Sequence, residues 1–305
     1  MGRAGTGWII FCLLLIMHFN AEGQGSPEIE LFGGITNYQG DLQPMVFTFK
    51  NSRPGWGVNY IQPLTPNFLM RAGLYAGRFT ASDADNKPNL QARNLSVYSR
   101  VTEVSLGLEA RLFDPAKYKL TPYGFLGIGY YRFNPYAYHP TYNGRVYLQP
   151  LSTEGQGLPG YEQQPYKLSQ FSLPYAFGIR WQVSCKTHIA LEFKHSKLFT
   201  DYLDDVSTTY PLEKDLLAGP GRQAADLSWR TDELNGTPYP TSTDVKRGNP
   251  RESDWFYFAG LKVGINLGDC GTNGQFFNNI FNRGGSNTKG FRNKKRLGNV
   301  ACPDF

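Results

Sequence analysis

One short segment brings together residue types that could perform hydrolysis. His195 is followed by Ser196, and Asp201 lies a few positions further on; a histidine with a serine and a carboxylate is the set that acyl transfer and hydrolysis use. Alternation along this segment, however, places His195 on the same face as Leu191 and Phe193. We therefore expect an interfacial histidine rather than a general base, and no catalytic residue in the chain.

Acidic residues are concentrated next to this segment. Asp201, Asp204 and Asp205 stand at the foot of the longest predicted loop. Carboxylates there could bind a hard cation such as calcium, or they could cap a turn and pair with basic residues of neighbouring loops, which is the interpretation we favour. The histidines combine with no cysteine at a recognised zinc spacing, so the sequence predicts neither a metal nor a cofactor.

The N-terminal residues have the parts of an export signal. Arg3 precedes an apolar run from Trp8 to Met17, and the small residues Ala21 and Gly23 follow it. This run is much shorter than the roughly 20 residues of a membrane-spanning helix. We expect residues 1–23 to be a signal peptide that is removed after Gly23.

Export leaves Cys185, Cys270 and Cys302, an odd number of cysteines in an oxidising compartment. Cys185 falls in a predicted short turn, and the other two bound the C-terminal segment on the same side of the membrane. We expect two of them to close an intrachain disulfide, or one to form a bridge to a partner protein. A free thiol is the alternative.

The elements that position these residues are strands. Apolar or aromatic residues occupy every second position from Leu173 to Val183 and again from Trp255 to Leu267, and this period indicates β-structure. The aromatic content of 15% and the 34 glycines favour strands as well. Weaker alternation predicts six more strands, giving eight in all, at residues 28–36, 55–62, 67–77, 97–112, 122–133 and 187–199.

The lengths of the predicted connections separate a membrane barrel from a soluble sandwich. Short links near residues 63–66, 114–121 and 184–186 alternate with long ones near 37–54, 78–96, 134–170 and 200–253. Short periplasmic turns and long extracellular loops are typical of outer-membrane barrels. The predicted fold is therefore all-β: an antiparallel transmembrane β-barrel of about eight strands over residues 24–267, located in the outer membrane with both termini in the periplasm.

The polar faces of the predicted strands carry charges of both signs. In a barrel of eight strands the interior is filled by side chains, so we expect these charges to neutralise one another in the lumen and to leave no wide pore. The predicted lumen network consists of Arg71, Glu103, Glu109, Arg111, Arg180, Glu192 and Lys262.

Beyond Leu267 the sequence turns to glycine, asparagine and basic residues, a composition that cannot bury a core. Residues 268–305 are predicted to be a flexible basic tail in the periplasm. The net charge of +6 is a mild excess, which we attribute to contact with outer-membrane lipid or to solubility and not to nucleic acid.

Four stretches go beyond general barrel features: residues 33–42, 122–129, 199–207 and 247–250, the last followed by Asp254 and Trp255. Together they resemble the PorG-type outer-membrane β-barrel proteins of the type IX secretion system, over residues 28–267. The matching motif residues are Gly40, Asp41, Leu42, Asp201, Tyr202, Leu203, Asp204, Asp205, Arg247, Gly248, Asn249 and Pro250.

This resemblance implies a non-enzymatic structural component that anchors periplasmic ring lipoproteins of the secretion machine to the outer membrane, with those lipoproteins as partners. Two alternatives stand beside it. One is an independent small barrel that acts as a narrow channel or as an adhesion or binding protein. The other is an outer-membrane hydrolase, for which the cluster around His195 is the sole candidate.

Overall fold

Eight long strands form the body of the chain in the computed structural model, which describes residues 26–45, 48–115 and 117–268. The predicted signal peptide, Cys270, Cys302 and the predicted tail beyond residue 268 lie outside the described residues. The eight strands are β1 (Glu28–Gln39), β2 (Arg53–Pro63), β3 (Phe68–Ser82), β4 (Ser96–Arg111), β5 (Leu120–Phe133), β8 (Ser169–Gln182), β9 (Thr187–Leu198) and β10 (Trp255–Asn266).

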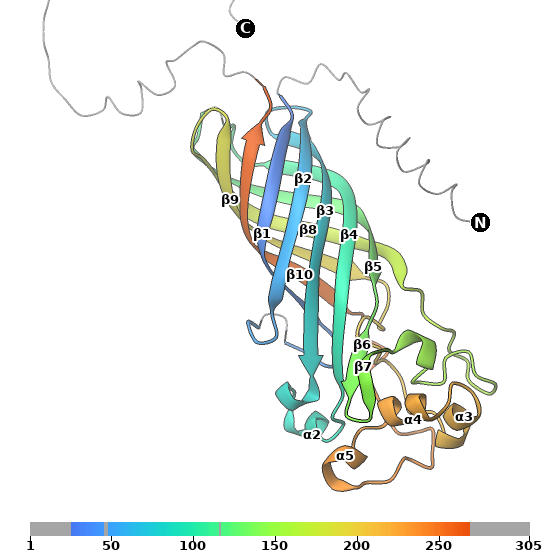
Figure 1. Cartoon of the computed structure of the whole chain (residues 1–305). Helices are drawn as coiled ribbons and strands as arrows, with labels where there is room; N and C mark the ends of the chain where they lie inside the picture. Colours follow the sequence, from blue (N-terminus) through green and yellow to red (C-terminus); the bar gives the residue numbers. More distant parts are fainter. Residues whose placement is uncertain (1–25, 46–47, 116, 269–305) are drawn as a thin grey trace, which may run out of the picture. The chain divides into compact units, whose positions relative to one another are not determined.

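Each strand pairs antiparallel with its neighbours, and the sheet closes on itself. β1 pairs with both β2 and β10, so the first and last strands meet. The remaining contact between β3 and β4 completes the ring, as Figure 1 shows. The predicted barrel of eight antiparallel strands is confirmed. Closure removes every sheet edge, which is the condition for strands to cross a membrane.

The wall of the barrel has an apolar outside and a polar inside. Along β9, for example, Ile189 and Leu191 are exposed whereas His188 and Glu192 are buried. Exposed apolar side chains recur around the whole wall, among them Leu31, Val58, Leu74, Leu106, Leu126, Ile128, Phe177, Leu261 and Val263. This is the surface that an outer-membrane barrel presents to lipid. No helix among the described residues combines the length and the apolar character needed to cross a membrane.

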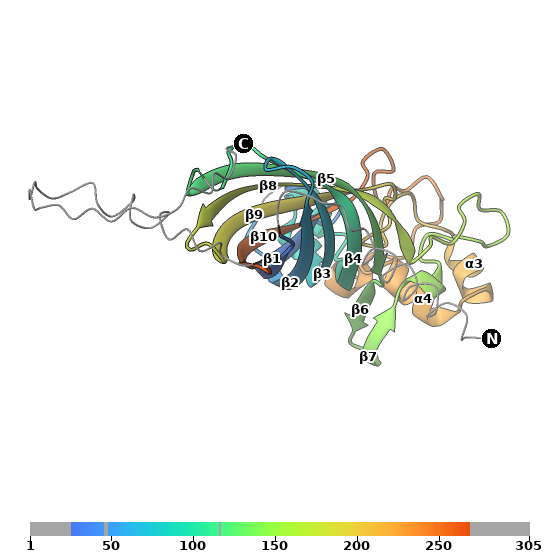
Figure 2. The ribbon, with the colours of Figure 1, turned by 90° about the horizontal axis from the view of Figure 1, so that it is seen from above.

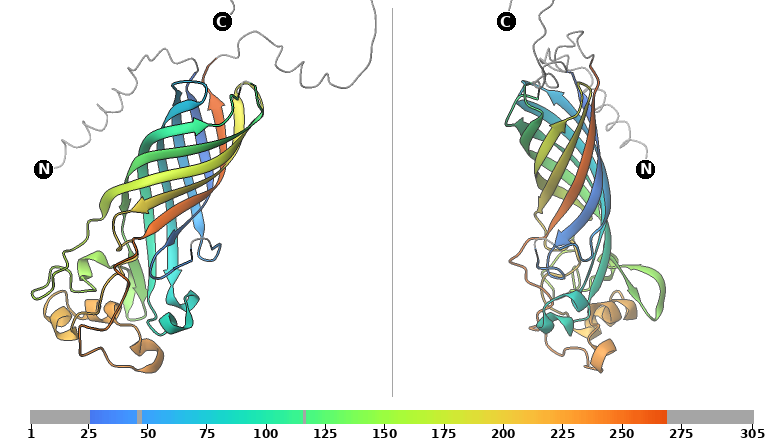
Figure 3. Two further views of the ribbon diagram at one scale, coloured as in Figure 1. Left: turned by 180° about the vertical axis from the view of Figure 1, so that it is seen from behind. Right: turned by 90° about the vertical axis from the view of Figure 1, so that its left-hand side faces the viewer.

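The two ends of the barrel differ, as Figures 2 and 3 show. At one end, here called the turn end, short links join β2 to β3, β4 to β5 and β8 to β9. At the other, here called the loop end, lie the longer links, with residues 40–52, 83–95, 134–168 and 199–254. These loops contain η1 (Asp83–Asp85), α2 (Pro88–Gln91), the hairpin β6 (Tyr136–His139) and β7 (Tyr142–Tyr147), η2 (Gln149–Leu151), α3 (Glu213–Ala218), α4 (Arg222–Ser228) and α5 (Asp232–Asn235).

Some strands extend further toward the loop end than alternation predicts. The strand predicted at 67–77 continues to Ser82, and β8 begins at Ser169 instead of 173. Past the apolar band the outward side chain is no longer apolar, as at the exposed Arg78, so the alternation signal ends before the strand does. The β6–β7 hairpin, which pairs with β4 through Tyr136 and Tyr98, has no alternation of this kind and was not predicted.

Candidate functional site

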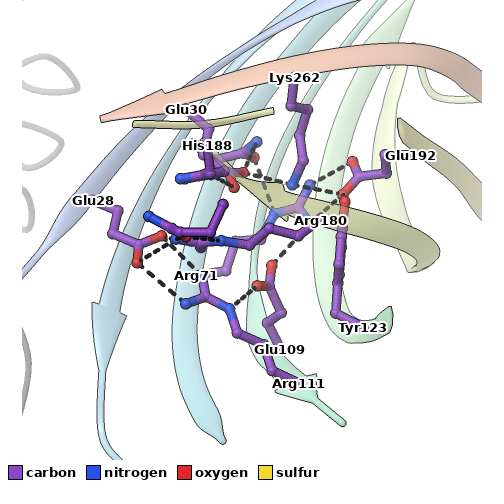
Figure 4. Close-up of polar contacts among 12 residues, drawn as sticks. Glu28, Glu30, Arg71, Glu109, Arg111, Tyr123, Arg180, His188, Glu192 and Lys262 are labelled. Carbon is purple, nitrogen blue, oxygen red and sulfur yellow. Dashed lines mark hydrogen bonds and ion pairs between the residues drawn. The ribbon is translucent and has the colours of Figure 1, made fainter. Parts of the chain in front are cut away.

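The interior of the barrel is filled by charged side chains from six strands. Arg71 of β3 faces Glu192 of β9 in a double contact, with Nη1 2.6 Å from Oε2 and Nη2 2.8 Å from Oε1. Lys262 of β10 joins the same carboxylate at 2.9 Å and also reaches Glu30 at 2.5 Å. Figure 4 shows this central group. Because the ion pairs come from strands far apart around the wall, they fix the strands across the lumen.

A second group lies nearer the turn end. Glu28 of β1 receives two guanidinium groups at once, from Arg111 at 2.9 Å and from Arg180 at 2.6 Å. Arg111 also contacts Glu109 at 3.1 Å. Toward the loop end, Lys194 pairs directly with Glu103. All seven residues of the predicted lumen network lie inside the barrel in ion pairs.

Alternation alone could have identified three further members of this network. Glu28 and Glu30 alternate with Ile29 and Leu31 at the start of β1, and Lys194 follows the parity of Glu192. With them, the lumen holds five acidic and five basic residues among those described: Glu28, Glu30, Glu103, Glu109 and Glu192 against Arg71, Arg111, Arg180, Lys194 and Lys262. The charges therefore cancel.

Charge balance also argues against a metal ion at one possible site in the lumen. Glu28, Glu30 and His188 place one ligand atom each within 4.8 Å of one another. Glu28 already accepts both arginines, and Glu30 accepts Lys262 as well as a contact of 2.8 Å with His188 Nε2. A divalent cation would add charge to a neutral, buried group, so the three residues act as part of the ion-pair network.

On the loop-end side of these charges, aromatic rings fill the barrel. Tyr75 packs against Phe32 and Phe258, with ring centroids 5.3 and 5.2 Å away. Tyr75 also donates its hydroxyl to Glu192 at 2.8 Å, which joins the aromatic layer to the ion pairs. Side chains thus occupy the lumen along its length, as expected for a narrow barrel.

The resemblance motifs from separate loops meet at the loop end. We call this group the loop cluster: Asp41, Leu42, Leu203, Asp204, Asp205, Arg247, Asn249 and Asp254. The Asp41 carboxylate accepts the backbone N–H of Asn249 at 3.0 Å, across 208 positions of the sequence. Asp204 accepts the N–H of Leu42 at 3.2 Å and the hydroxyl of Tyr38 at 2.9 Å. The first loop is thereby joined to the last one.

Two glycines in these motifs stand where backbone and carboxylates come close. A side chain on Gly40 would place its Cβ 2.1 Å from Oδ1 of Asp254. On Gly248 it would lie 2.6 Å from both Oδ2 of Asp41 and the backbone nitrogen of Ser207. Both positions need glycine because no larger residue fits between the joined loops.

Arg247 is buried and connects the last loop to the 134–168 loop. Its Nη1 lies 3.1 Å from Glu154 and its Nη2 lies 3.6 Å from Asp205. Asp205 has a φ of +67°, a left-handed conformation that costs energy for a residue with a side chain, and it accepts the hydroxyls of Thr153 at 2.5 Å and Tyr166 at 2.7 Å. Glu154 was not predicted, since nothing local in its sequence marks it as buried.

Other motif residues take supporting places. Leu203 is fully buried and donates its N–H to Asp254 at 2.7 Å. Tyr202 stacks on Tyr166 with ring centroids 5.0 Å apart. Pro250 is exposed and lies in a turn in which the Glu252 N–H donates to the Asn249 carbonyl at 3.2 Å.

Burial changes the acidity of the loop carboxyls. It raises the pKa of Asp204 to about 7, with the nearby Asp41 carboxylate acting in the same direction. Burial also raises the pKa of Asp41 and of Asp205 to about 6 and that of Asp201 to about 8. These oxygens form no group of three within coordination reach among the described residues. They bind backbone N–H groups and hydroxyls, as the turn-capping interpretation predicts.

His195 and Ser196, the candidate hydrolytic pair, lie on opposite faces of the barrel wall. His195 stacks on Trp255 with centroids 4.6 Å apart, and its Nδ1 lies 2.7 Å from the hydroxyl of Tyr175. Ser196 is buried on the lumen side and accepts a hydrogen bond from Lys194 at 3.1 Å. The two side chains face opposite ways, so they do not form a nucleophile and its base.

Cys185 lies in the turn between β8 and β9 and is disulfide-bonded. The other cysteines of the expected mature chain lie outside the described residues. Whether Cys185 pairs with one of them or with a partner protein stays a prediction.

Solved outer-membrane barrels resemble this chain at low identity. Ail, the attachment invasion locus protein of Yersinia pestis, aligns over 79% of this chain and 97% of its own at 11% identity and a TM-score of 0.38. The N-terminal β-barrel domain of OprF from Pseudomonas aeruginosa covers 80% and 99% at 16% identity and 0.34. OprG from the same organism covers 80% and 99% at 10% identity and 0.35. At these scores the barrel assignment depends on the strand pairing described above.

No functionally curated protein matches the sequence. A family model described as "Domain of unknown function (DUF6089)" matches residues 7–218. That match covers more than half of the chain, from before β1 to the end of α3. The chain is thus a small outer-membrane β-barrel protein that belongs to the DUF6089 family.

Proposed function

We propose that this barrel is a non-enzymatic structural component of the type IX secretion machinery that anchors periplasmic ring lipoproteins to the outer membrane. The observation that carries the proposal is the convergence of the resemblance motifs. Asp41, Asp204 and Asn249, from the first and last loops, are in one hydrogen-bonded cluster. The three motifs at the loop end thus form one structural unit, which favours their origin in one PorG-like family.

The lumen supports a mechanical role over a transport role. Buried ion pairs such as Arg71–Glu192 cross the barrel, and the aromatic layer around Tyr75 fills the lumen toward the loop end. A solute would have to break these contacts to pass, and separating a buried pair costs about 3 to 5 kcal/mol. A barrel with a filled lumen and hydrogen-bonded loops is suited to withstand mechanical load.

The proposal includes an orientation. The short turns, the start of β1 and the end of β10 face the periplasm, and the long loops face outward, as in bacterial barrels with an even number of strands. Ring lipoproteins would then contact the turn end, where Lys186 and Cys185 lie in the β8–β9 turn.

Site-specific photocrosslinking in native membranes tests this directly. A photoreactive amino acid would replace Lys186 at the turn end or, as the matched control, Lys246 in the 199–254 loop; both side chains are exposed. We expect a crosslink to a periplasmic lipoprotein from position 186 and none from position 246. A deletion strain should also lose secretion of cargo proteins.

Two results would overturn the proposal. Crosslinks to lipoproteins from position 246 alone would reverse the orientation. A normal secretome in the deletion strain, with no crosslink from position 186, would instead favour an independent barrel with a binding or narrow channel role.

A further inference from the structure

Three arginines lie side by side on the outer wall of the barrel near the loop end. Arg78, Arg100 and Arg132 belong to the neighbouring strands β3, β4 and β5, and all three are exposed. Each follows the outward parity of its strand, since Leu74, Val104 and Ile128 on the same faces are exposed as well. We call these residues the arginine patch.

The strand register places the three arginines close to one another on the wall. Arg78 is the direct cross-strand partner of Arg100. Arg132 is paired with Thr102, the next outward residue of β4. Directly opposed residues have Cβ atoms about 5 Å apart, and like charges in such pairs repel. Within the described part of the chain, none of the three has an ion pair or a side-chain hydrogen bond.

The patch lies at the border of the apolar band. From Leu112 at the turn end of β4 to Arg100 is roughly 40 Å along the strand at about 3.3 Å per residue, and strand tilt reduces this to about 30 Å of height, just beyond the roughly 25 Å band of such barrels. Next to Arg132, the rings of Tyr130 and Phe171 meet edge to face at 5.4 Å. Aromatic side chains of this kind mark the level of lipid headgroups.

Tyrosines continue the surface beyond the patch. Tyr98 of β4 stacks on Tyr136 at 5.7 Å and meets Tyr138 edge to face at 5.2 Å. Arg145 of β7 lies 5.1 Å over the ring of Tyr136. The β6–β7 hairpin that carries these residues stands beside β4 and projects from the wall (Figures 2 and 3). The hairpin therefore adds ring faces with polar hydroxyls next to the arginines.

We propose that this surface binds a phosphorylated glycolipid of the outer leaflet, of the lipid A type. Acyl chains would lie on Leu74, Val104 and Ile128, and phosphate groups would bridge the arginines, whose planar guanidinium groups suit bidentate contact with phosphate. The sugars would lie against the tyrosines, since an aromatic ring with a hydroxyl suits a partly polar surface. A bridging phosphate also removes the repulsion between Arg78 and Arg100.

The proposal uses the orientation given above, with the loops outside, but it does not depend on a role in secretion. Its test is a binding measurement on the purified full-length protein. Native mass spectrometry in detergent would count bound lipid with two probes, lipid A carrying both phosphates and the same lipid after removal of the phosphates. We expect the wild type to prefer the phosphorylated form by about tenfold or more.

Two triple variants make the test specific. The patch variant carries Arg78→Gln, Arg100→Gln and Arg132→Gln. The matched control carries Lys214→Gln, Lys246→Gln and Arg251→Gln, which removes the same charge from exposed positions of the 199–254 loop. Heat-modifiable gel migration verifies that each variant forms a barrel.

The patch variant should lose the preference for phosphates, and the control variant should keep it. Equal binding of both lipids by the wild type would overturn the proposal, as would an unchanged preference in a folded patch variant. An equal loss in both variants would show that only net charge matters and would overturn it too. Because secretion is not measured, failure here leaves the anchoring proposal intact.

Discussion

Arg71 and Glu192 are 121 positions apart in the sequence and form a two-point ion pair at the centre of the barrel, with contacts of 2.6 and 2.8 Å. The pair joins β3 to β9 on the opposite side of the ring. Both side chains are almost completely buried, so neither can regain water while the barrel is closed. Their mutual contact is therefore a condition for a folded lumen.

Replacing Arg71 by methionine should destabilise the barrel strongly. The side chain keeps most of its volume, but Glu192 and Glu109 lose a buried counter-ion, which costs about 3 to 5 kcal/mol. Urea unfolding in lipid vesicles would measure the change. The matched control is Lys117→Met, which removes an exposed pair of 3.8 Å with Asp114 and should have little effect. Similar losses in both variants would contradict the assigned role of the lumen network.

Inward charges such as Arg71 and Glu192 could be predicted from sequence because the parity of a strand is a local property. Each lies between outward apolar neighbours, so its face follows from period two alone. Which charges meet could not be predicted in this way. The double contact of Glu28 with Arg111 and Arg180 depends on strand tilt and on closure between β1 and β10, neither of which any single segment encodes.

For the loop cluster, too, the residues could be predicted from sequence but their contacts could not. Motif residues such as Asp41, Asp204 and Arg247 could be selected from sequence, but their joint position depends on three loops that fold over the barrel together. Glu154 was not selected because its partners, Arg247 and the N–H of Ser207, come from another loop. Helices α3 and α4 were missed for a related reason: short helices stabilised by tertiary contacts carry little signal of their own.

The loop cluster should loosen as the pH rises. The pKa of Asp204 is raised to about 7 from its usual 3.8, and a carboxyl with a raised pKa favours the folded state when protonated. Its contribution is therefore complete below about pH 4 and is lost as the pH rises toward about 7. The Leu42 and Val206 amides both donate to the Asp204 carboxyl. Their hydrogen exchange, corrected for intrinsic rates, should be slower at about pH 5 than at about pH 8.

The variant Asp204→Asn tests whether this group causes the pH effect. It should reduce the difference in protection between the two pH values, since the titrating carboxyl is gone. The matched control Asp244→Asn changes an exposed carboxylate of the same loop, which accepts a hydrogen bond from the Ser242 hydroxyl at 2.8 Å, and should leave the difference unchanged. An unaltered pH effect in Asp204→Asn would assign it to other loop carboxyls.

Replacing Gly248 by alanine should separate the first loop from the last. The new Cβ would lie 2.6 Å from the Asp41 carboxylate and from the Ser207 backbone, and overpacking of this kind costs about 1 to 3 kcal/mol. Faster proteolysis of the 199–254 loop in folded protein would measure it. Gly33→Ala is the control because nothing lies within 4 Å of its added Cβ. Unchanged proteolysis in Gly248→Ala would show that the contact is not needed.

The His195→Ala variant separates a packing role from a catalytic one. We expect loss of the stacking on Trp255 and of the Tyr175 contact, with a decrease in stability of about 1 kcal/mol and no change in the chemistry of membrane lipids or proteins. Mass spectrometry of outer-membrane lipids and proteins from the variant strain provides the second measurement. Loss of any modification there would revive the hydrolase alternative, and Ser196→Ala would then be the next variant to compare.

The disulfide of Cys185 can be tested in isolated outer membranes. Because Cys185 is disulfide-bonded, it should resist a thiol-alkylating reagent until a reductant is added. Non-reducing gels of the single variants Cys270→Ser and Cys302→Ser would then identify the partner, since only the variant that lacks the partner should expose Cys185. A higher-mass band that disappears on reduction would show a bridge to another protein instead. Free alkylation of Cys185 without reductant in the wild type would refute the bond itself.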